Sequence, residues 1–401
     1  MQDTSGTAAQ RLHGLDFLRA TMMLLGVVLH SAQLYLTMPI IDYYWDPVRS
    51  FSMDAVLIFI NTFRMPVFYL LSGFFTAMLL VRRGERGMFE NRYERLIVPF
   101  VLFLPPLALV MTILRIYARH IMATGEWGFD PGLVYYPRRI WDNTHNLWFL
   151  YYLILYLGTV WLLLKLWHRL GETRRSSISA WAQRTPIFSA KIFLPVCLGL
   201  AALGSISFAG RLSGSLSFVP YLPVYLYFGL CYAMGWLLYQ RLEDLNALAT
   251  RWPRDMVIAT VALVIALGAF FAKGGMPSGE VTLSARYVVA HAVLSLATGF
   301  SMGFYMLAFV GLFSRHFQGY NAWIRYVSDS AYWVFIFHSV PLVMLALPLH
   351  DWQVPAELKF LVVCSGTFSI CLISYQLFVR NGRIGEILNG RRYDSVPWKK
   401  T

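Results

Sequence analysis

The stretch LDFLRATMMLLGVVLHSAQLYL, residues 15–36, decides the fold class, because a bilayer is crossed by about 20 consecutive apolar residues. It contains two ionisable residues, Arg19 and His30. Eleven residues at about 100° each are close to three helical turns, so both side chains are expected on one helix face, about 16 Å apart along the axis. Ionisable groups are costly in a membrane and usually face a protein interior or a wet cavity. The pair is therefore a candidate catalytic site.

The whole chain has the composition of a membrane protein with many spans. Of its 401 residues, 57% are hydrophobic and only 14% are charged, whereas a soluble domain has about 25% charged residues. The net charge of +13 does not indicate a nucleic-acid partner, because the charges lie in short loops between apolar segments. The four cysteines show neither CxxC nor metal-ligand spacing, so we expect no disulfide framework and no metal site.

The sequence predicts an all-α, polytopic protein with about ten transmembrane helices. We expect the second span to be broken near Arg64 and Pro66, as membranes permit where the backbone lines a cavity. The predicted organisation is a polar cytoplasmic N-terminus (1–14), a single transmembrane domain (15–380) and a basic cytoplasmic tail (381–401). The ten predicted spans are 15–36, 55–81, 96–117, 146–167, 192–210, 219–239, 256–272, 287–313, 329–349 and 358–379.

The positions of Lys and Arg predict the orientation of these spans. With both termini in the cytoplasm, 23 of the 34 Lys and Arg residues fall in cytoplasmic segments and nine fall in outer segments. This bias is the one that the positive-inside rule expects. Arg19 is then near the cytoplasmic end of its span, and His30 is more than halfway across.

Three further arginines could bind an anionic ligand. Arg64 lies deep in its span, where it could pair with an anionic substrate or a buried acid; the alternative is an arginine that extends to the membrane surface. Arg92 and Arg95 are spaced i, i+3 at the predicted cytoplasmic mouth, where two guanidinium groups on one helix face could clamp phosphates. The alternative for these two is a topology anchor or a lipid-headgroup contact.

Histidines and neighbouring residues complete the candidate site. His30 can act as a general base, or it can be a structural histidine bonded to a neighbouring helix, and His338 could line the same cavity. Asp16 either holds Arg19 in place or caps the start of the helix. His145 and Trp148 could meet an acceptor from outside, although an interfacial tryptophan is ordinary. Ser72 precedes a glycine that allows close backbone approach, and it is a further candidate for substrate binding.

Five motifs in order resemble the membrane acyltransferase-3 family. The first is the D-x-x-R-A start with its Arg-x10-His frame at 16–30. The others are FRMPVFYLLSGFF (63–75), RYERLIVPF (92–100), LWFLYYLILY (147–156) and YWVFIFHSVP (332–341). The resemblance covers nearly the whole chain. One departure is that Asn146 separates His145 from the Leu-Trp-Phe-Leu run that a histidine directly precedes in the family.

The resemblance implies a function and roles for the matching residues. The chain looks most like family members of the bacterial inner membrane that move a succinyl group from cytosolic succinyl-CoA to hydroxyls of osmoregulated periplasmic glucans. His30 matches the essential histidine of the family, Arg19 matches the arginine of the same motif, and Arg92 and Arg95 match its R-x-x-R motif. Acyl-CoA is then a co-substrate, with no tightly bound cofactor. The alternatives are an O-acetyltransferase for another envelope polysaccharide or lipid-linked sugar, and a transporter or flippase.

Overall fold

The computed structural model describes residues 4–38, 44–133, 143–275, 284–319 and 321–390, and all regular elements in these ranges are helices. The only β pairing in the same ranges is an isolated bridge between Asn143 and Ser217. The α-helices are α1 (Thr4–Ala32), α2 (Phe51–Arg92), α3 (Val98–Thr124), α4 (Trp148–Arg169), α5 (Glu172–Arg184), α6 (Ala190–Gly204), α7 (Leu222–Gln240), α8 (Asp244–Ala272), α9 (Ala285–His316), α10 (Ala322–Phe337), α11 (Ser339–Ala346), α12 (Ala356–Ser374) and α13 (Arg383–Asn389).

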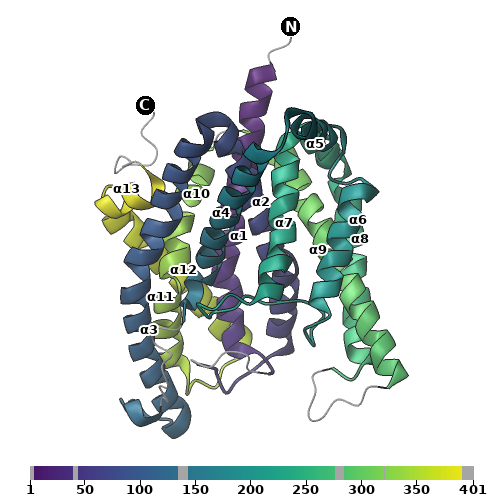
Figure 1. Ribbon diagram of the computed structural model, residues 1–401. Helices are drawn as coiled ribbons and strands as arrows, with labels where there is room; N and C mark the ends of the chain where they lie inside the picture. Colours follow the sequence, from purple (N-terminus) through teal and green to yellow (C-terminus); the bar gives the residue numbers. More distant parts are fainter. Residues whose placement is uncertain (1–3, 39–43, 134–142, 276–283, 320, 391–401) are drawn as a thin grey trace.

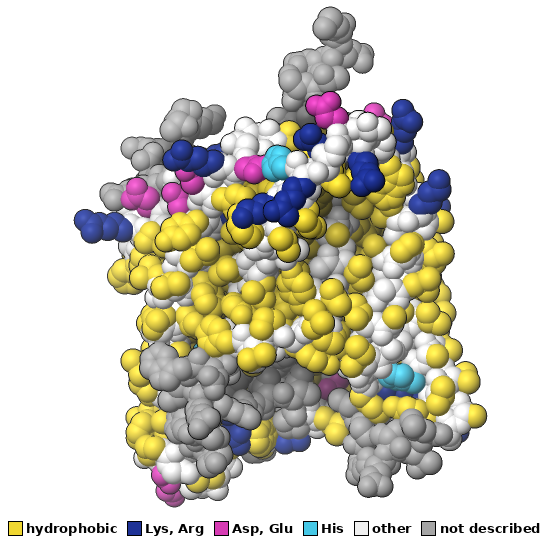
Figure 2. Space-filling model, viewed as in Figure 1, with side chains coloured by type: hydrophobic (Ala, Val, Ile, Leu, Met, Phe, Trp, Pro, Cys, Tyr) yellow, Lys and Arg dark blue, Asp and Glu magenta, His cyan; other side chains and the backbone are white. Residues whose placement is uncertain are grey.

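The helices form a bundle (Figure 1), and the face of it shown in Figure 2 carries a broad hydrophobic band. The first turns of α1 lie at the same end of the bundle as α5 and α13 (Figure 1). Lys and Arg side chains gather at this end, above the hydrophobic band (Figure 2). The arrangement is that of a protein whose helices cross a membrane, as the composition predicts.

By length and composition, seven helical stretches among the described residues could cross a membrane, or eight if the bent pair α10–α11 is one span. The difference from the predicted ten has two sources. The stretch Phe51–Thr124 contains both the second and the third predicted spans. The predicted span 192–210 corresponds to α6, whose 15 residues are short for a full crossing.

The predicted break in the second span is wrong. Helix α2 runs without interruption through Arg64 and Pro66, and its only residue with non-helical dihedral angles is Gly84, at φ 69°. Transmembrane helices tolerate proline because neighbouring groups satisfy the backbone groups that it frees. The break lies instead in the predicted span 329–349, where α10 and α11 meet at His338 with a bend of 63°.

A proline explains the position of this bend. Pro341 lies in the first turn of α11, where proline is tolerated. It has no N–H to donate to the carbonyl of Phe337, four residues earlier, so the helical hydrogen bonds cannot continue through this point. The bend leaves His338 between two helix segments in the middle of the bundle.

Close contacts between helices depend on small residues. A Cβ atom added to Gly73 would lie 1.9 Å from the carbonyl oxygen of Tyr232, and one added to Gly235 would lie 1.7 Å from that of Leu70. The backbones of α2 and α7 therefore touch, which glycine permits in membrane helices. The predicted close approach beside Ser72 is confirmed.

The predicted terminal segments contain helix. Helix α1 begins at Thr4, inside the predicted polar N-terminus 1–14, and α13 occupies part of the predicted tail 381–401. Residues 1–3 and 391–401 lie outside the described ranges. Helix α1 passes through the centre of the bundle and packs against α2, α9 and α10 (Figure 1).

Candidate functional site

His30 lies in the last turn of α1, which ends at Ala32 and continues into a 3₁₀ turn, η1 (Gln33–Tyr35). Its ring is half-buried, and its Nδ1 lies 2.7 Å from Oε1 of Gln33. Because an amide oxygen only accepts hydrogen bonds, Nδ1 carries the proton and Nε2 keeps its lone pair. The side chain of Gln33 therefore orients the ring of His30 so that Nε2 can accept a proton, a contact that the sequence did not predict.

The ring of His338 stacks on that of His30, with centroids 5.2 Å apart and an interplanar angle of 30°. His338 is 1% exposed. Its Nδ1 donates to the carbonyl oxygens of Phe335, at 2.7 Å, and Val334, at 3.1 Å. Its Nε2 is buried and has no hydrogen-bond partner among the described residues. The structure thus brings two of the predicted site residues together as a pair of imidazoles, each with Nδ1 held by the protein.

Asn146 supports the bend on which His338 lies. Its side-chain nitrogen donates to the carbonyl oxygens of Phe335 and Ile336, at 3.2 and 3.3 Å. His145 has a left-handed backbone conformation, φ 48°, which is unusual for a residue other than glycine. Asn146, rather than His145, therefore connects the start of α4 to the bend. Asn146 is also the residue at which this sequence departs from the family motif.

Arg64 is a buried charge beside the two imidazoles. It is 8% exposed, and its Nη2 makes a weak hydrogen bond to the sulfur of Met65, at 3.4 Å. No carboxylate within the described residues pairs with it, and its Nε has no partner there. Its charge acts on both His30 and His338. An uncompensated buried guanidinium is costly, so this position favours an anionic ligand over a purely structural role.

A glycine makes room for this guanidinium. A Cβ atom added to Gly26 of α1 would lie only 2.7 Å from Nη1 of Arg64. Gly26 is one turn before His30, so the same face of α1 carries both the space for Arg64 and the imidazole. The only indication of this contact in the sequence is that Gly26 lies four residues before His30, on the same helix face.

A second group of charged residues surrounds Tyr332 of α10. The charges of Arg19, Arg92 and Arg95 all act on this tyrosine. Arg19 Nη2 lies 2.6 Å from Oδ1 of Asp16, so Asp16 holds Arg19 and does not cap α1, which begins at Thr4. The structure therefore groups Arg19 with the other two arginines, whereas His30 is grouped with Arg64.

Arg92 and Arg95 point to different partners. Nη2 of Arg92 donates to Oγ1 of Thr76, at 2.8 Å. Nη1 of Arg95 donates to the carbonyl oxygens of Ile387 and Glu386, at 2.8 and 3.3 Å, at the end of α13. The segment between them is a π-helix, η2 (Tyr93–Ile97), whose wider turn changes the angular spacing of side chains. The two guanidinium groups therefore bond to different elements, Arg92 to α2 and Arg95 to α13.

A small cavity of about 10 Å³ adjoins Arg92, with space for about one water molecule. Its polar lining consists of Ser72, Thr76, Arg92 and Tyr232. The hydroxyl of Ser72 donates to the carbonyl oxygen of Phe68, at 2.9 Å. Because α2 is continuous here, its backbone N–H groups are used in the helix and cannot form an oxyanion hole.

Trp148 packs within the protein. Its ring lies 6.1 Å from Tyr152 and 6.0 Å from Phe228, between ring centroids. A Cβ atom added to Gly214 would lie 2.5 Å from the indole. Within the described residues, the aromatic rings that Trp148 contacts include neither imidazole, so the structure does not bring it together with His30.

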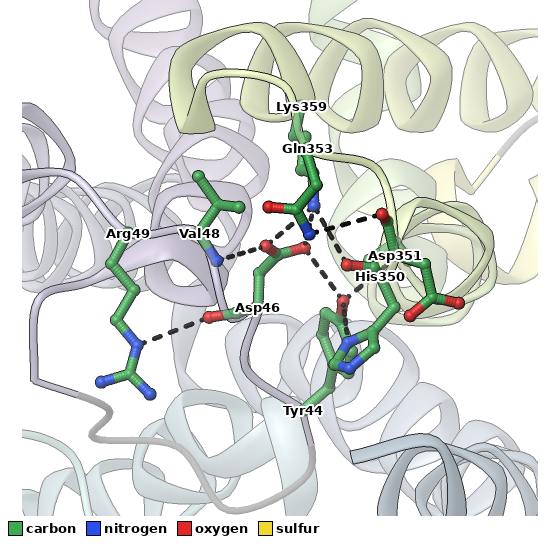
Figure 3. Close-up of polar contacts among 9 residues, drawn as sticks. Tyr44, Asp46, Val48, Arg49, His350, Asp351, Gln353 and Lys359 are labelled. Atoms are coloured by element: carbon green, nitrogen blue, oxygen red, sulfur yellow. Dashed lines mark hydrogen bonds and ion pairs between the residues drawn. The ribbon is translucent and has the colours of Figure 1, made fainter. Parts of the chain in front are cut away.

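A buried ion pair joins Asp46, which follows η1 in the chain, to Lys359 of α12 (Figure 3). Lys359 Nζ lies 2.9 Å from both carboxylate oxygens of Asp46, and both side chains have no exposed surface. The hydroxyl of Tyr44 also donates to Asp46, at 3.2 Å. The backbone N–H of Asp46 in turn donates to the carbonyl oxygen of Leu34, at 2.9 Å, inside η1. This pair therefore fixes the turn that carries the partner of His30.

The comparison with known families agrees with this arrangement. The acyltransferase-3 family model, described as an acyltransferase domain, matches residues 12–379. The chain belongs to the acyltransferase-3 family. Because the match covers most of the chain and the bundle is helical and apolar, the protein is a multi-pass membrane protein of this family.

Part of the chain is also similar in sequence to curated proteins. The chain is 31% identical, over 154 residues, to proteins named glucans biosynthesis protein C from Salmonella paratyphi B (strain ATCC BAA-1250 / SPB7) and Salmonella heidelberg (strain SL476). The match spans 38% of this chain and 38% of the length of each relative. No solved structure matches the chain.

Proposed function

We propose that this acyltransferase moves a succinyl group from cytosolic succinyl-CoA to a hydroxyl group of an osmoregulated periplasmic glucan, in the inner membrane of a bacterium. One observation carries the proposal: Arg64 is a buried cation without a carboxylate partner among the described residues, next to the imidazole pair. A succinyl group ends in a carboxylate that would compensate this charge, and an acetyl group does not. The name of the relatives supports a glucan as the acceptor.

The donor would bind at the end of the bundle that carries α5, α13 and the start of α1. We assign this end to the cytoplasm, because Lys and Arg gather there (Figure 2). Arg19 and Arg92 would bind the phosphates of CoA, with Arg95 holding α13 beside them. The long, nearly uncharged pantetheine arm would extend into the bundle and bring the thioester towards His30.

The chemistry would be acyl transfer with His30 as general base. The hydroxyl oxygen of the acceptor attacks the thioester carbonyl carbon while Nε2 of His30 takes the hydroxyl proton. The tetrahedral intermediate then collapses, the C–S bond breaks, and the CoA thiolate leaves with the proton returned from the imidazolium. Gln33 holds Nδ1 of His30 throughout, so that Nε2 is the atom that exchanges the proton. Transfer through an acyl-histidine is the second route that this arrangement allows.

The test compares donors in purified protein with glucan as acceptor. Wild type is expected to use succinyl-CoA in preference to acetyl-CoA, and Arg64→Met is expected to lose this preference by a factor of about 10 to 100, the range of a hydrogen-bonded charge pair. Arg86→Met is the matched control, because Arg86 is exposed and pairs only with Glu90 among the described residues.

Two results would contradict the proposal. If wild type prefers acetyl-CoA and Arg64→Met leaves the donor preference unchanged, the protein is an O-acetyltransferase for another envelope polysaccharide or lipid-linked sugar. If neither donor is consumed and the protein moves glucan across a membrane unmodified, the protein is a transporter.

A further inference from the structure

The second imidazole has no task in the acyl transfer described so far. Direct transfer needs one base, and Nε2 of His30 supplies it. His338 is nevertheless buried in contact with His30, and its Nε2 has no partner among the described residues. A buried acceptor without a partner is costly, so its persistence calls for a ligand that donates to it.

The hydrogen bonds around His338 fix which of its two ring nitrogens carries the proton. The carbonyl oxygens of Phe335 and Val334 require the proton to be on Nδ1, and Asn146 braces the same turn through Phe335 and Ile336. His338 therefore presents a lone pair at Nε2 and cannot donate there.

We propose that His338 selects acceptors that carry two neighbouring hydroxyl groups. One hydroxyl gives its proton to His30 and is acylated. The hydroxyl on the adjacent carbon donates a hydrogen bond to Nε2 of His338 and orients the ring of the acceptor. This inference rests on the proposed acyl transfer, and it specifies its acceptor as a vicinal diol of the kind that a sugar ring offers. An acceptor with a single hydroxyl would leave Nε2 of His338 buried and unpaired.

The test uses two small acceptors with the same ring, trans-1,2-cyclohexanediol and cyclohexanol, with succinyl-CoA as donor. Wild type is expected to show a kcat/KM for the diol about 10 to 100 times that for the monohydric alcohol, well above the factor of about two that a second equivalent hydroxyl gives by number alone. His338→Met removes the acceptor and is expected to lower this ratio tenfold or more. His338→Gln keeps an acceptor oxygen and is expected to retain most of the ratio.

The control is His291→Met, because His291 lies on α9 and its Nε2 contacts the carbonyl oxygen of Ser205, away from the pair. This variant is expected to keep the wild-type ratio. Each variant is first compared with wild type by thermal unfolding in detergent, and His338→Leu, which also removes the acceptor, is used if His338→Met does not fold.

The outcomes separate this inference from the proposed function. Transfer of succinyl to both alcohols with similar kcat/KM in wild type would overturn the inference and leave the proposed function intact. A diol preference that survives unchanged in a folded His338→Met protein would overturn it as well. No transfer from succinyl-CoA to glucan or to either alcohol would refute the proposed function, and the inference with it.

Discussion

Replacing Lys359 by methionine should destabilise the protein strongly. The ammonium group lies 2.9 Å from both oxygens of Asp46, and neither side chain is exposed (Figure 3). Methionine has a similar length but no charge. The substitution therefore leaves the carboxylate of Asp46 buried with neutral donors only, the backbone N–H of Val48 at 2.8 Å and the hydroxyl of Tyr44 at 3.2 Å.

The size of the effect follows from these contacts. Breaking a buried ion pair by removing one partner costs about 3–5 kcal/mol. The two remaining donors stabilise Asp46 in part, so we expect a loss near the lower limit, about 3 kcal/mol. For a chain of this length, whose entropy of unfolding is about 0.8 kcal/mol/K, this corresponds to a fall in Tm of about 4 °C. Because Asp46 also fixes η1 through Leu34, acyl transfer should fall as well.

The assay is thermal unfolding of the purified protein in detergent, with Lys191→Met as the control for an exposed lysine. The double variant Asp46→Asn with Lys359→Met removes both charges, and it should recover at least half of the lost Tm, because the cost lies in the unpaired charge. A fall of less than about 2 °C in Lys359→Met, or a double variant no more stable than the single one, would show that an unpaired buried carboxylate does not set the stability of this region.

Three further substitutions test the rest of the site. Arg92→Met should raise the KM for succinyl-CoA about tenfold or more, since it removes a charge-assisted phosphate contact; an unchanged KM would exclude Arg92 from the donor site. Arg95→Met should instead lower the Tm, because Arg95 bonds the last carbonyls of α13; an unchanged Tm with a raised KM would show that both arginines bind CoA. Gly26→Ala places a methyl group 2.7 Å from Nη1 of Arg64 and should reduce the preference for succinyl-CoA over acetyl-CoA by about 10- to 100-fold; a preserved preference would separate Arg64 from donor selection.

Features that depend on local spacing could be predicted from the sequence. A single apolar helix carries both Arg19 and His30, and the acid three residues before Arg19 does pair with it. Gly73 brings α2 and α7 together, as a glycine in a membrane span suggests. These features involve contacts within one helix, or a residue whose lack of a side chain lets two helix backbones meet.

The position of the broken span could not be decided by counting prolines. Pro66 lies in the interior of α2 and Pro341 in the first turn of α11, and each removes one backbone donor. Only the packing around each proline determines whether the helix bends. The carbonyls of Phe335 and Ile336, just before this bend, accept hydrogen bonds from the side chains of Asn146 and His338, so the bend leaves these two carbonyls paired.

Contacts between distant segments were beyond the sequence alone. Asp46 and Lys359 are 313 residues apart, and nothing in either segment indicates the other. The π-helix at residues 93–97 precedes Pro99, which has no N–H to donate to the carbonyl of Arg95, and the hydroxyl of the distant Tyr332 donates to that carbonyl instead. Arg95 consequently holds α13, a contact that the i, i+3 spacing did not predict.

In the proposed reaction, the acyl group passes from a donor on one side of the membrane to a hydroxyl on the other, by way of His30. The decisive experiment uses sealed proteoliposomes that contain glucan in the lumen, with radiolabelled succinyl-CoA added only outside. Molecules oriented with the Arg19 and Arg92 end outwards should label the lumenal glucan, and His30→Ala should abolish the label while its thermal unfolding remains that of wild type. Label that appears only on glucan supplied on the donor side, or lumenal label that persists in His30→Ala, would contradict transfer through the bundle by way of this imidazole.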